Sequence, residues 1–300
     1  MHTNRLSLLF STDFVAKKPS ITIVGPGNVA NVLGPALRRA GYRVDEVVSR
    51  ELPESIRRAK VLAKKSGASA ATIADARIDA DVIWICSTDD AIAPVARLLA
   101  KRRDLDWRSK IVLHASGALT SDVLPALKKR GASVASAHFM QTFAPGSNPT
   151  LRVPFAVEGD ARAKEVAIQI GRALNAKPFV IRKQSKVLYH AMGSFSSPMV
   201  VAALSLGEEL GRVAGLSREQ IRLVMAPIFS RTAENYLKKG TKGAFGGPLN
   251  RGNIATVKMQ LKELKRVPEA RAAYLPLATA AIKRLPVKNR KQLQELFRKG

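Results

Sequence analysis

The chain has 300 residues, enough for two ordinary domains. Hydrophobic residues make up 46% and charged residues 24%, ordinary globular values that exclude wholesale disorder. Formal net charge is +27, and residues 251–300 hold 13 Lys or Arg against three Glu. A basic surface attracts nucleic acid, anionic membrane or anionic substrates. No DNA- or RNA-reading motif accompanies the charge, so we expect a solvated basic face, with nucleic-acid binding as the weaker alternative.

The first nineteen residues are predicted to be a tail and not a secretory signal, because the apolar run at 6–10 is too short and is soon followed by charges. The longest apolar stretch, near 195–206, is interrupted by serines and Pro198 and falls short of the ~20 residues that span a bilayer. The single cysteine, Cys86, excludes an internal disulfide and a multi-thiolate zinc site. We therefore expect a soluble, cytoplasmic protein with no metal and no membrane partner.

Short β-branched runs alternate with helical stretches through the first half. The expected strands are Ile21–Val24, Arg43–Val48, Asp81–Cys86, Lys110–His114 and Ala132–Ala137, with two further short strands at Pro154–Val157 and Pro178–Ile181 around a helix near Ala161–Leu174. This spacing indicates parallel pairing with right-handed crossovers. The predicted class is α/β, with a doubly wound, mostly parallel sheet over residues 20–182.

The turn after the first strand is the most informative segment. Gly25-x-Gly27-x-x-Ala30 matches the dinucleotide fingerprint, and it follows a strand and opens a helix as that mechanism requires. Gly25 permits the tight turn, Gly27 allows a pyrophosphate to approach, and Ala30 keeps helix and strand close. Backbone N–H groups at the helix start, including those of Asn28 and Val29, favour an anion. The alternative is a purely structural turn.

The end of the second strand indicates which nucleotide is bound. An NAD site places an acidic residue there, whereas this strand ends in Ser49-Arg50, and Asp45 and Glu46 lie too early to reach the ribose. A hydroxyl followed by a guanidinium suits a 2′-phosphate. NADP(H) is therefore the predicted cofactor, unless Arg50 is only a surface residue.

Three later strand ends are expected to line the same crevice. Ser87-Thr88 follows the third strand, where helix capping is the alternative role. His114-x-Ser116 and His138-x-x-Gln141 follow the next two. Ligands bind outside the carboxyl ends of such strands. We expect Ser87, Thr88 and His114 to contact the cofactor, and Ser116, His138 and Gln141 the substrate.

Residues 183–300 are predicted to form an all-α domain. A long helix from about 185 to 213 is expected to break near Gly193 and Pro198, and Ser217-x-x-Gln220 is a capping box for the next helix, which should stop at Gly240. A loop is expected at 243–252, Asn253 should cap a helix, and Pro268 should open another.

The long helix has a polar stripe that can face a cleft. Lys186, His190, Ser194 and Ser197 are spaced four, four and three residues apart, which places them along one face. His190 and Lys186 are the plausible proton donors, and Ser194 and Arg251 are candidate substrate contacts. A stripe satisfied by neighbouring helices is the alternative, and Arg251 can equally be solvated.

With these segments in place, the chain resembles a poorly characterised bacterial family that pairs a Rossmann-like NADP-binding domain with a helical domain of unknown function. The motifs that support the resemblance run in order from about 21 to 264: Ile23-Val24-Gly25-x-Gly27, Val47-Val48-Ser49-Arg50, His114-x-Ser116-Gly117-Ala118, His138-x-x-Gln141-Thr142-Phe143, Leu188-Tyr189-His190-Ala191 and Gly247-Pro248-x-x-Arg251-Gly252. More distantly it is similar to hydroxyacid and phosphogluconate dehydrogenases, ketopantoate reductase and pyrroline-5-carboxylate reductase.

The resemblance implies hydride transfer at a cleft between the domains and a homodimer formed through the helices. It leads to the hypothesis of an NADP-dependent oxidoreductase acting on a small carbonyl, imine or hydroxyacid, which can be anionic. The chain departs from the family at Phe139-Met140, where Pro-Leu is typical, and at Pro198, where Asn is frequent. These departures leave open a non-catalytic NADP-binding protein that senses redox state or serves as a partner.

Overall fold

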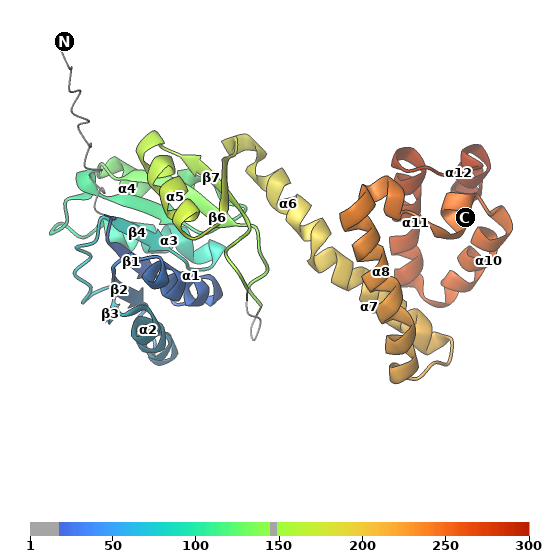
Figure 1. Cartoon of the computed structure of the whole chain (residues 1–300), viewed down its shortest axis with the longest axis horizontal. Coiled ribbons are helices and arrows are strands. Elements are labelled where there is room, and N and C mark those ends of the chain that lie inside the picture. Colours follow the sequence, from blue (N-terminus) through green and yellow to red (C-terminus); the bar gives the residue numbers. More distant parts are fainter. Residues whose placement is uncertain (1–17, 145–148, 300) are drawn as a thin grey trace, which may run out of the picture. The chain divides into compact units, whose positions relative to one another are not determined.

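A single eight-stranded sheet dominates the first half of the chain (Figure 1). The computed structural model describes residues 18–144 and 149–299, so almost all of the predicted tail lies outside the described residues. The strands are β1 (Ile21–Val24), β2 (Val44–Ser49), β3 (Ser69–Thr72), β4 (Val82–Ile85), β5 (Ile111–His114), β6 (Ser133–Phe139), β7 (Pro154–Gly159) and β8 (Lys177–Val180). Their order in the sheet is β3-β2-β1-β4-β5-β6-β7-β8.

The predicted fold class is confirmed. All neighbouring strands pair in parallel except β6 and β7, which are antiparallel. The strand order reverses between β1 and β4, where doubly wound sheets bind ligands. Because β1, β4, β5 and β6 are neighbours and parallel, the predicted site residues that follow them are brought to one edge of the sheet. The edge strand β3 was not foreseen, since its sequence Ser-Ala-Ala-Thr has little β-branched character.

Helices cover both faces of the sheet, as the buried clusters show. On one face α1 (Asn28–Arg39), α2 (Pro53–Ser66) and α5 (Ala161–Ala173) share a buried apolar cluster with alternate strand residues. On the other, α3 (Asp89–Ala100), α4 (Pro125–Lys129) and a 3-10 turn at Trp107–Ser109 do the same. Strands buried on both faces explain the continuous apolar runs in the sequence.

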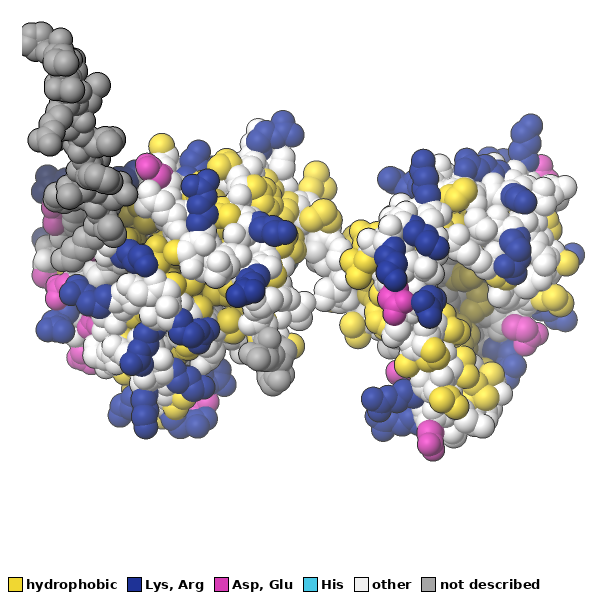
Figure 2. Space-filling view, in the orientation of Figure 1, with side chains coloured by type: hydrophobic (Ala, Val, Ile, Leu, Met, Phe, Trp, Pro, Cys, Tyr) yellow, Lys and Arg dark blue, Asp and Glu magenta, His cyan; other side chains and the backbone are white. Residues whose placement is uncertain are grey.

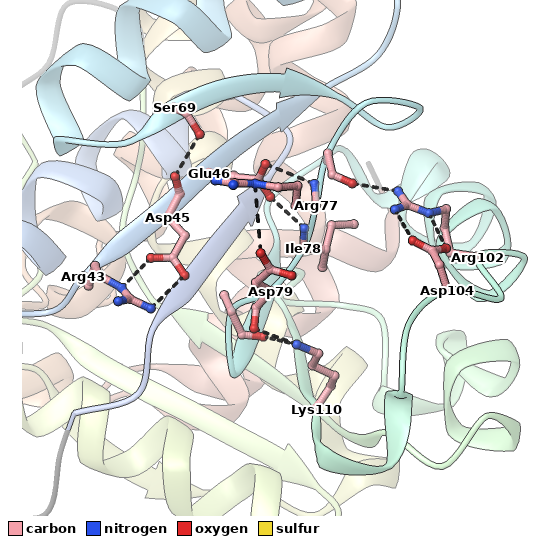
Figure 3. Close-up of polar contacts among 12 residues, drawn as sticks. Arg43, Asp45, Glu46, Ser69, Arg77, Ile78, Asp79, Arg102, Asp104 and Lys110 are labelled. Carbon is pink, nitrogen blue, oxygen red and sulfur yellow. Dashed lines mark hydrogen bonds and ion pairs between the residues drawn. The ribbon is translucent and has the colours of Figure 1, made fainter.

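Side chains hold the stretch that joins β3 to β4, residues 73–81 (Figure 3). The buried Glu46 carboxylate accepts the backbone N–H groups of Arg77, at 3.1 Å, and Ile78, at 2.8 Å. Arg102 and Lys110 donate to backbone carbonyls of the same stretch. Buried backbone N–H and C=O groups require hydrogen-bond partners, and here side chains supply the partners that a helix or strand would otherwise provide.

The chain divides into two compact units, with the boundary in the sequence between Gly193 and Ser194. From residue 183 onward the described elements are helical: α6 (Lys186–Ser196), α7 (Pro198–Val213), α8 (Arg218–Ala244), α9 (Gly247–Arg251), α10 (Ile254–Glu263), α11 (Pro268–Arg284) and α12 (Arg290–Lys299), with short 3-10 turns at Lys183–Ser185 and Leu264–Arg266. A separate apolar cluster formed mainly by α10, α11 and α12 makes the core of the second unit.

Capping and helix-breaking residues in the sequence predicted most of these helix boundaries correctly. Ser217 and Gln220 form the predicted capping box, and the Asn253 side chain caps α10. The predicted break falls at Ser197, between α6 and α7. The expected loop at 243–252 is wrong in part: α8 continues to Ala244 through a kink at Gly240, and residues 247–251 form α9. Pro248 suits the first turn of that short helix, and Gly252, with φ of 65°, ends it.

Candidate active site

The glycine turn forms the floor of a pocket of about 380 Å³ in the first unit. Gly25 has φ of 96°, and a Cβ there would lie 2.8 Å from the backbone nitrogen of Ser87, so only glycine fits this turn. Gly27 is the N-cap of α1, and Ala30 is buried beneath the helix. The pocket is lined by Gly25, Gly27, Asn28, Val29, Ser49, Arg50, Ser87, Thr88 and neighbouring side chains. The predicted cofactor-binding residues are thus brought together, apart from the buried Ala30 and from His114.

The pocket has an orphaned hydroxyl and a basic wall. The Ser87 Oγ is buried and has no hydrogen-bond partner among the described residues. Arg50 is exposed and, within the described part of the chain, forms no ion pair, whereas Arg58 bonds to Glu54 at 2.8 Å. Hydrogen bonds from Arg57 and Arg58 lower the pKa of Glu54 to about 2. Arg50 is therefore the cation in this pocket whose charge is most available to an anion.

Two pocket residues already have local partners. The buried Ser49 Oγ donates to the carbonyl of Arg50 at 3.1 Å. The Asn28 side chain donates to the carbonyl of Phe143 at 2.9 Å, which ties the segment after β6 to the start of α1. Thr88 occupies the N-cap position of α3, but its side chain forms no capping hydrogen bond.

A buried row of polar side chains crosses β5, β6 and β7. His114 is paired in register with Ser136, and Ser136 with Glu158, so the three side chains share one face of the sheet. Each is no more than 2% exposed. Such groups are costly to bury unless they are hydrogen-bonded. All three bond to the turn at 115–121.

The row of His114, Ser136 and Glu158 fixes the turn at 115–121 by several hydrogen bonds. The backbone N–H of Ser116 donates to His114 Nδ1 at 3.3 Å, so Nε2 bears the proton and donates to the Thr120 carbonyl at 3.2 Å. Burial lowers the pKa of His114 to about 3, which leaves it neutral. Glu158 accepts from the backbone N–H and the hydroxyl of Ser121, at 2.6 and 3.0 Å. His114 therefore lies beneath the site, and its contact with a cofactor stays a prediction.

Lys186 is buried at this turn. The side chain is 1% exposed, and its Nζ donates to the Ser116 carbonyl at 2.6 Å. The same carbonyl accepts the Ser136 hydroxyl at 3.2 Å. Among the described residues, Lys186 has no carboxylate within ion-pair distance. Burial lowers the pKa of Lys186 to about 8, and the charges of Glu158 and Asp89 oppose that shift.

Two imidazoles and a phenol lie over the same turn. His138 Nδ1 is 3.1 Å from the Tyr189 hydroxyl, and the His138 and His190 rings are 5.9 Å apart between centroids. A Cβ on Gly117 would clash with both imidazoles, so the glycine makes room for them. Burial lowers the pKa of His138 to about 3 and raises that of Tyr189 to about 12. At neutral pH this group offers a neutral imidazole, a neutral phenol and, behind them, the Lys186 ammonium.

The remaining predicted site residues lie elsewhere. Gln141 bonds to its own segment, accepting from the Thr142 N–H at 2.9 Å. Ser194 and Arg251 belong to the second unit, so their substrate contacts stay predictions. Gly117, Ser136, Tyr189 and Glu158 were not among the predicted site residues. The one available signal for Glu158 was a carboxylate directly after the apolar run Phe155-Ala-Val157, which is unusual in a buried strand.

Three solved structures illustrate the likeness of the whole chain. A Bacteroides fragilis protein assigned as an NADP oxidoreductase is 22% identical with a TM-score of 0.73, covering 89% of this chain and 99% of that chain. The imine reductase from Myxococcus stipitatus in complex with NADP+ is 15% identical with a TM-score of 0.64, covering 88% and 94%. The reductive aminase from Aspergillus terreus in complex with NADPH and ethyl-5-oxohexanoate is 17% identical with a TM-score of 0.63, covering 93% and 99%. No curated protein sequence matches.

The fold and the candidate site together define a class of protein: a doubly wound, nucleotide-binding first domain is followed by a helical second domain. Residues 9–138 match a Rossmann-like domain, and residues 153–281 match the domain of unknown function DUF2520. These two domains, in this order, are the pairing that the resemblance found in the sequence rests on, and the matches confirm that resemblance.

Proposed function

We propose that this protein is an NADP-dependent oxidoreductase that transfers a hydride to or from a small carbonyl, imine or hydroxyacid. The observation that supports this most is the pairing, at one edge of one sheet, of a glycine-turn pocket with a cluster of proton-bearing side chains. Solved structures of similar fold are an imine reductase with NADP+ and a reductive aminase with NADPH. The predicted domain boundary at 183 and a site closed by the helical domain remain parts of this proposal.

The residues of the pocket fit a dinucleotide. Gly25 and Gly27 leave room for a pyrophosphate at the start of α1, the orphaned Ser87 hydroxyl lacks a partner that a ligand can supply, and Arg50 suits a 2′-phosphate. When bound, NADPH supplies the hydride, and the protein supplies placement and electrostatics.

Proton transfer is assigned to the cluster on β5, β6 and α6. His190 is exposed at the surface of the cluster and is the proposed acid/base, within reach of the neutral His138. Lys186 is buried behind the Ser116 carbonyl, so it contributes a positive potential that favours an anionic substrate or developing negative charge. His138, Ser116, Gln141, Ser194 and Arg251 are the proposed substrate contacts.

Nucleotide titration tests the cofactor part of the proposal. We expect NADPH to bind more tightly than NADH, and Arg50→Ala to weaken NADPH binding by about 10-fold or more while leaving NADH nearly unchanged, because a charge-assisted bond to the 2′-phosphate contributes about 1.5–3 kcal/mol. Arg103→Ala, an exposed arginine outside the pocket lining, is the matched control. Equal affinities for the two nucleotides would contradict the role of Arg50. NADPH binding without turnover on carbonyls, imines and hydroxyacids would favour the redox-sensing alternative.

We further propose that a second copy of the chain covers the helical surface of the second unit. Within the described part, α7 has no buried residue and the 27-residue α8 has one, Ile221. Leu223, Ile228 and Leu237 on α8 are 74%, 63% and 81% exposed. Figure 2 shows hydrophobic side chains gathered over this helix pair. Soluble monomers rarely expose so large an apolar surface.

A lipid membrane is the alternative partner for the exposed apolar surface of α7 and α8. By length and composition, residues 183–213 are long and apolar enough to cross a membrane, and the most apolar stretch among them is not buried. However, the stretch breaks at Ser197, and the apolar surface continues onto α8, which also has Arg222, Arg231 and Glu234. A mixed surface of this kind suits a protein partner better than lipid.

Replacing Leu223 and Ile228 together by Glu should convert a dimer into a monomer, because the new charges would be buried without partners. Light scattering coupled to size-exclusion chromatography measures the mass. Met259→Glu, at a 62% exposed position on α10, should leave the mass unchanged. A monomeric wild-type protein would refute the dimer, and its sedimentation with lipid vesicles would favour the membrane.

A further inference from the structure

Glu158 is a buried carboxylate for which the proposed chemistry has no direct use. It is 2% exposed, lies on β7 and is the last member of the polar row that begins at His114. Both of its oxygens accept hydrogen bonds from Ser121, the pattern of an ionised carboxylate. A buried charge requires an opposite charge or a dense set of donors. Ser121 supplies two such donors.

The opposite charge is the Lys186 ammonium. Ser136, the cross-strand partner of Glu158, donates to the Ser116 carbonyl, which also accepts from Lys186. The Ser116 carbonyl thus binds both the Lys186 ammonium and the cross-strand neighbour of Glu158, while Ser121, which donates to Glu158, belongs to the same turn as Ser116. Lys183 lies on the exposed side and is already paired with Asp122 at 2.7 Å.

We infer that Glu158 is a positioning residue that keeps the buried Lys186 protonated and directed at the Ser116 carbonyl. This inference rests on the proposed role of Lys186 in the site. The other titratable groups facing Lys186 are Asp89 at the start of α3, His114 on β5 and His138 on β6. Both imidazoles are neutral at physiological pH and Asp89 is exposed to solvent, so Glu158 is the buried negative charge of the set.

The test follows the protonation of Lys186 in the full-length protein by NMR, with lysine ¹³C-labelled at Cε and the Lys186 signal assigned by its loss in Lys186→Met. The wild-type signal should titrate near pH 8. In Glu158→Gln the midpoint should fall by about one pH unit, because the charge that favours the ammonium is lost. Glu158→Asp, which keeps the charge, should restore a midpoint near that of the wild type.

Glu46→Gln is the matched control. Glu46 is also a buried strand carboxylate that accepts two hydrogen bonds, here from backbone N–H groups, so its loss should cost similar stability without moving the Lys186 midpoint. An unchanged midpoint in Glu158→Gln, or an equal fall in Glu46→Gln, would overturn the inference.

A melting-temperature cycle covers the case in which Glu158→Gln does not fold. Glu158→Gln should lower the melting temperature less in a Lys186→Met background, because no ammonium then remains uncompensated. Equal losses in both backgrounds, or no rescue of folding by Lys186→Met, would refute the coupling. Neither measurement uses a substrate or nucleotide, so failure of the oxidoreductase proposal and failure of this inference are told apart.

Discussion

Replacing Lys186 with methionine should make the protein more stable while removing most of its turnover. The ammonium is 1% exposed and lacks an ion pair among the described residues, so desolvation penalises it in the folded state. Methionine fills a similar volume, and the Ser116 carbonyl keeps the Ser136 hydroxyl as a donor. Burial holds the pKa of Lys186 below its ordinary value in spite of the attraction of Glu158, so the desolvation penalty that is removed exceeds the attraction that is lost, and Glu158 keeps its two hydrogen bonds from Ser121. The free energy of unfolding should therefore rise by about 1–3 kcal/mol near pH 7. Loss of the positive potential should lower the turnover number by about 10²–10³.

The stability gain should depend on pH in a defined direction. The folded-state pKa of Lys186, about 8, lies below its ordinary value of 10.5, which the unfolded chain approaches. Below pH 8 the lysine is charged in both states and the folded protein bears the full cost. Between pH 8 and 10.5 the folded protein loses the proton first, so the advantage of methionine should decline over that interval.

Urea unfolding at several pH values, together with NADPH oxidation on a substrate that the wild type reduces, measures both effects. Lys183→Met is the control, because Lys183 is exposed and ion-paired with Asp122, and it should change neither quantity appreciably. A Lys186→Met protein with wild-type turnover would show that the buried ammonium serves packing alone.

Replacing His190 with glutamine should lower turnover by about 10²–10⁴ and leave NADPH affinity nearly unchanged, the usual range for losing a positioned acid/base. His190 is exposed, so the free energy of unfolding should change by no more than about 0.5 kcal/mol. Steady-state kinetics and thermal melting of the same preparation measure the two quantities.

Gln184→Ala, at an exposed position just before α6, should alter neither quantity and serves as the control. Normal turnover in the His190 variant would transfer the acid/base role to the pair formed by His138 and Tyr189, whose hydrogen bond of 3.1 Å already connects a proton donor to an acceptor. Tyr189→Phe would then be the variant that loses activity.

Local sequence signals were sufficient for the class of fold and for the nucleotide pocket. The Gly25 turn and the strand end at Ser49-Arg50 line one pocket because each follows a strand directly, so its place in the sheet is set by short-range structure. Helix starts were equally local, since the Ser217 capping box and the Asn253 cap depend on residues three positions away. The polar stripe of α6 likewise indicated Lys186 and His190.

What the sequence could not determine is which of these polar groups are buried and against what. Glu158 lies 28 residues from Lys186 in sequence, and only the antiparallel pairing of β7 with β6 brings it, through Ser136, to the turn that holds Lys186. His114 and His138 lie near the ends of the neighbouring strands β5 and β6, yet His114 is fully buried and His138 contacts Tyr189. Charge and protonation depend on burial and on partners distant in the chain, which strand register decides. The sequence alone indicated where the candidate site lies, and the tertiary structure decided which of its groups are buried and therefore which favour the neutral form.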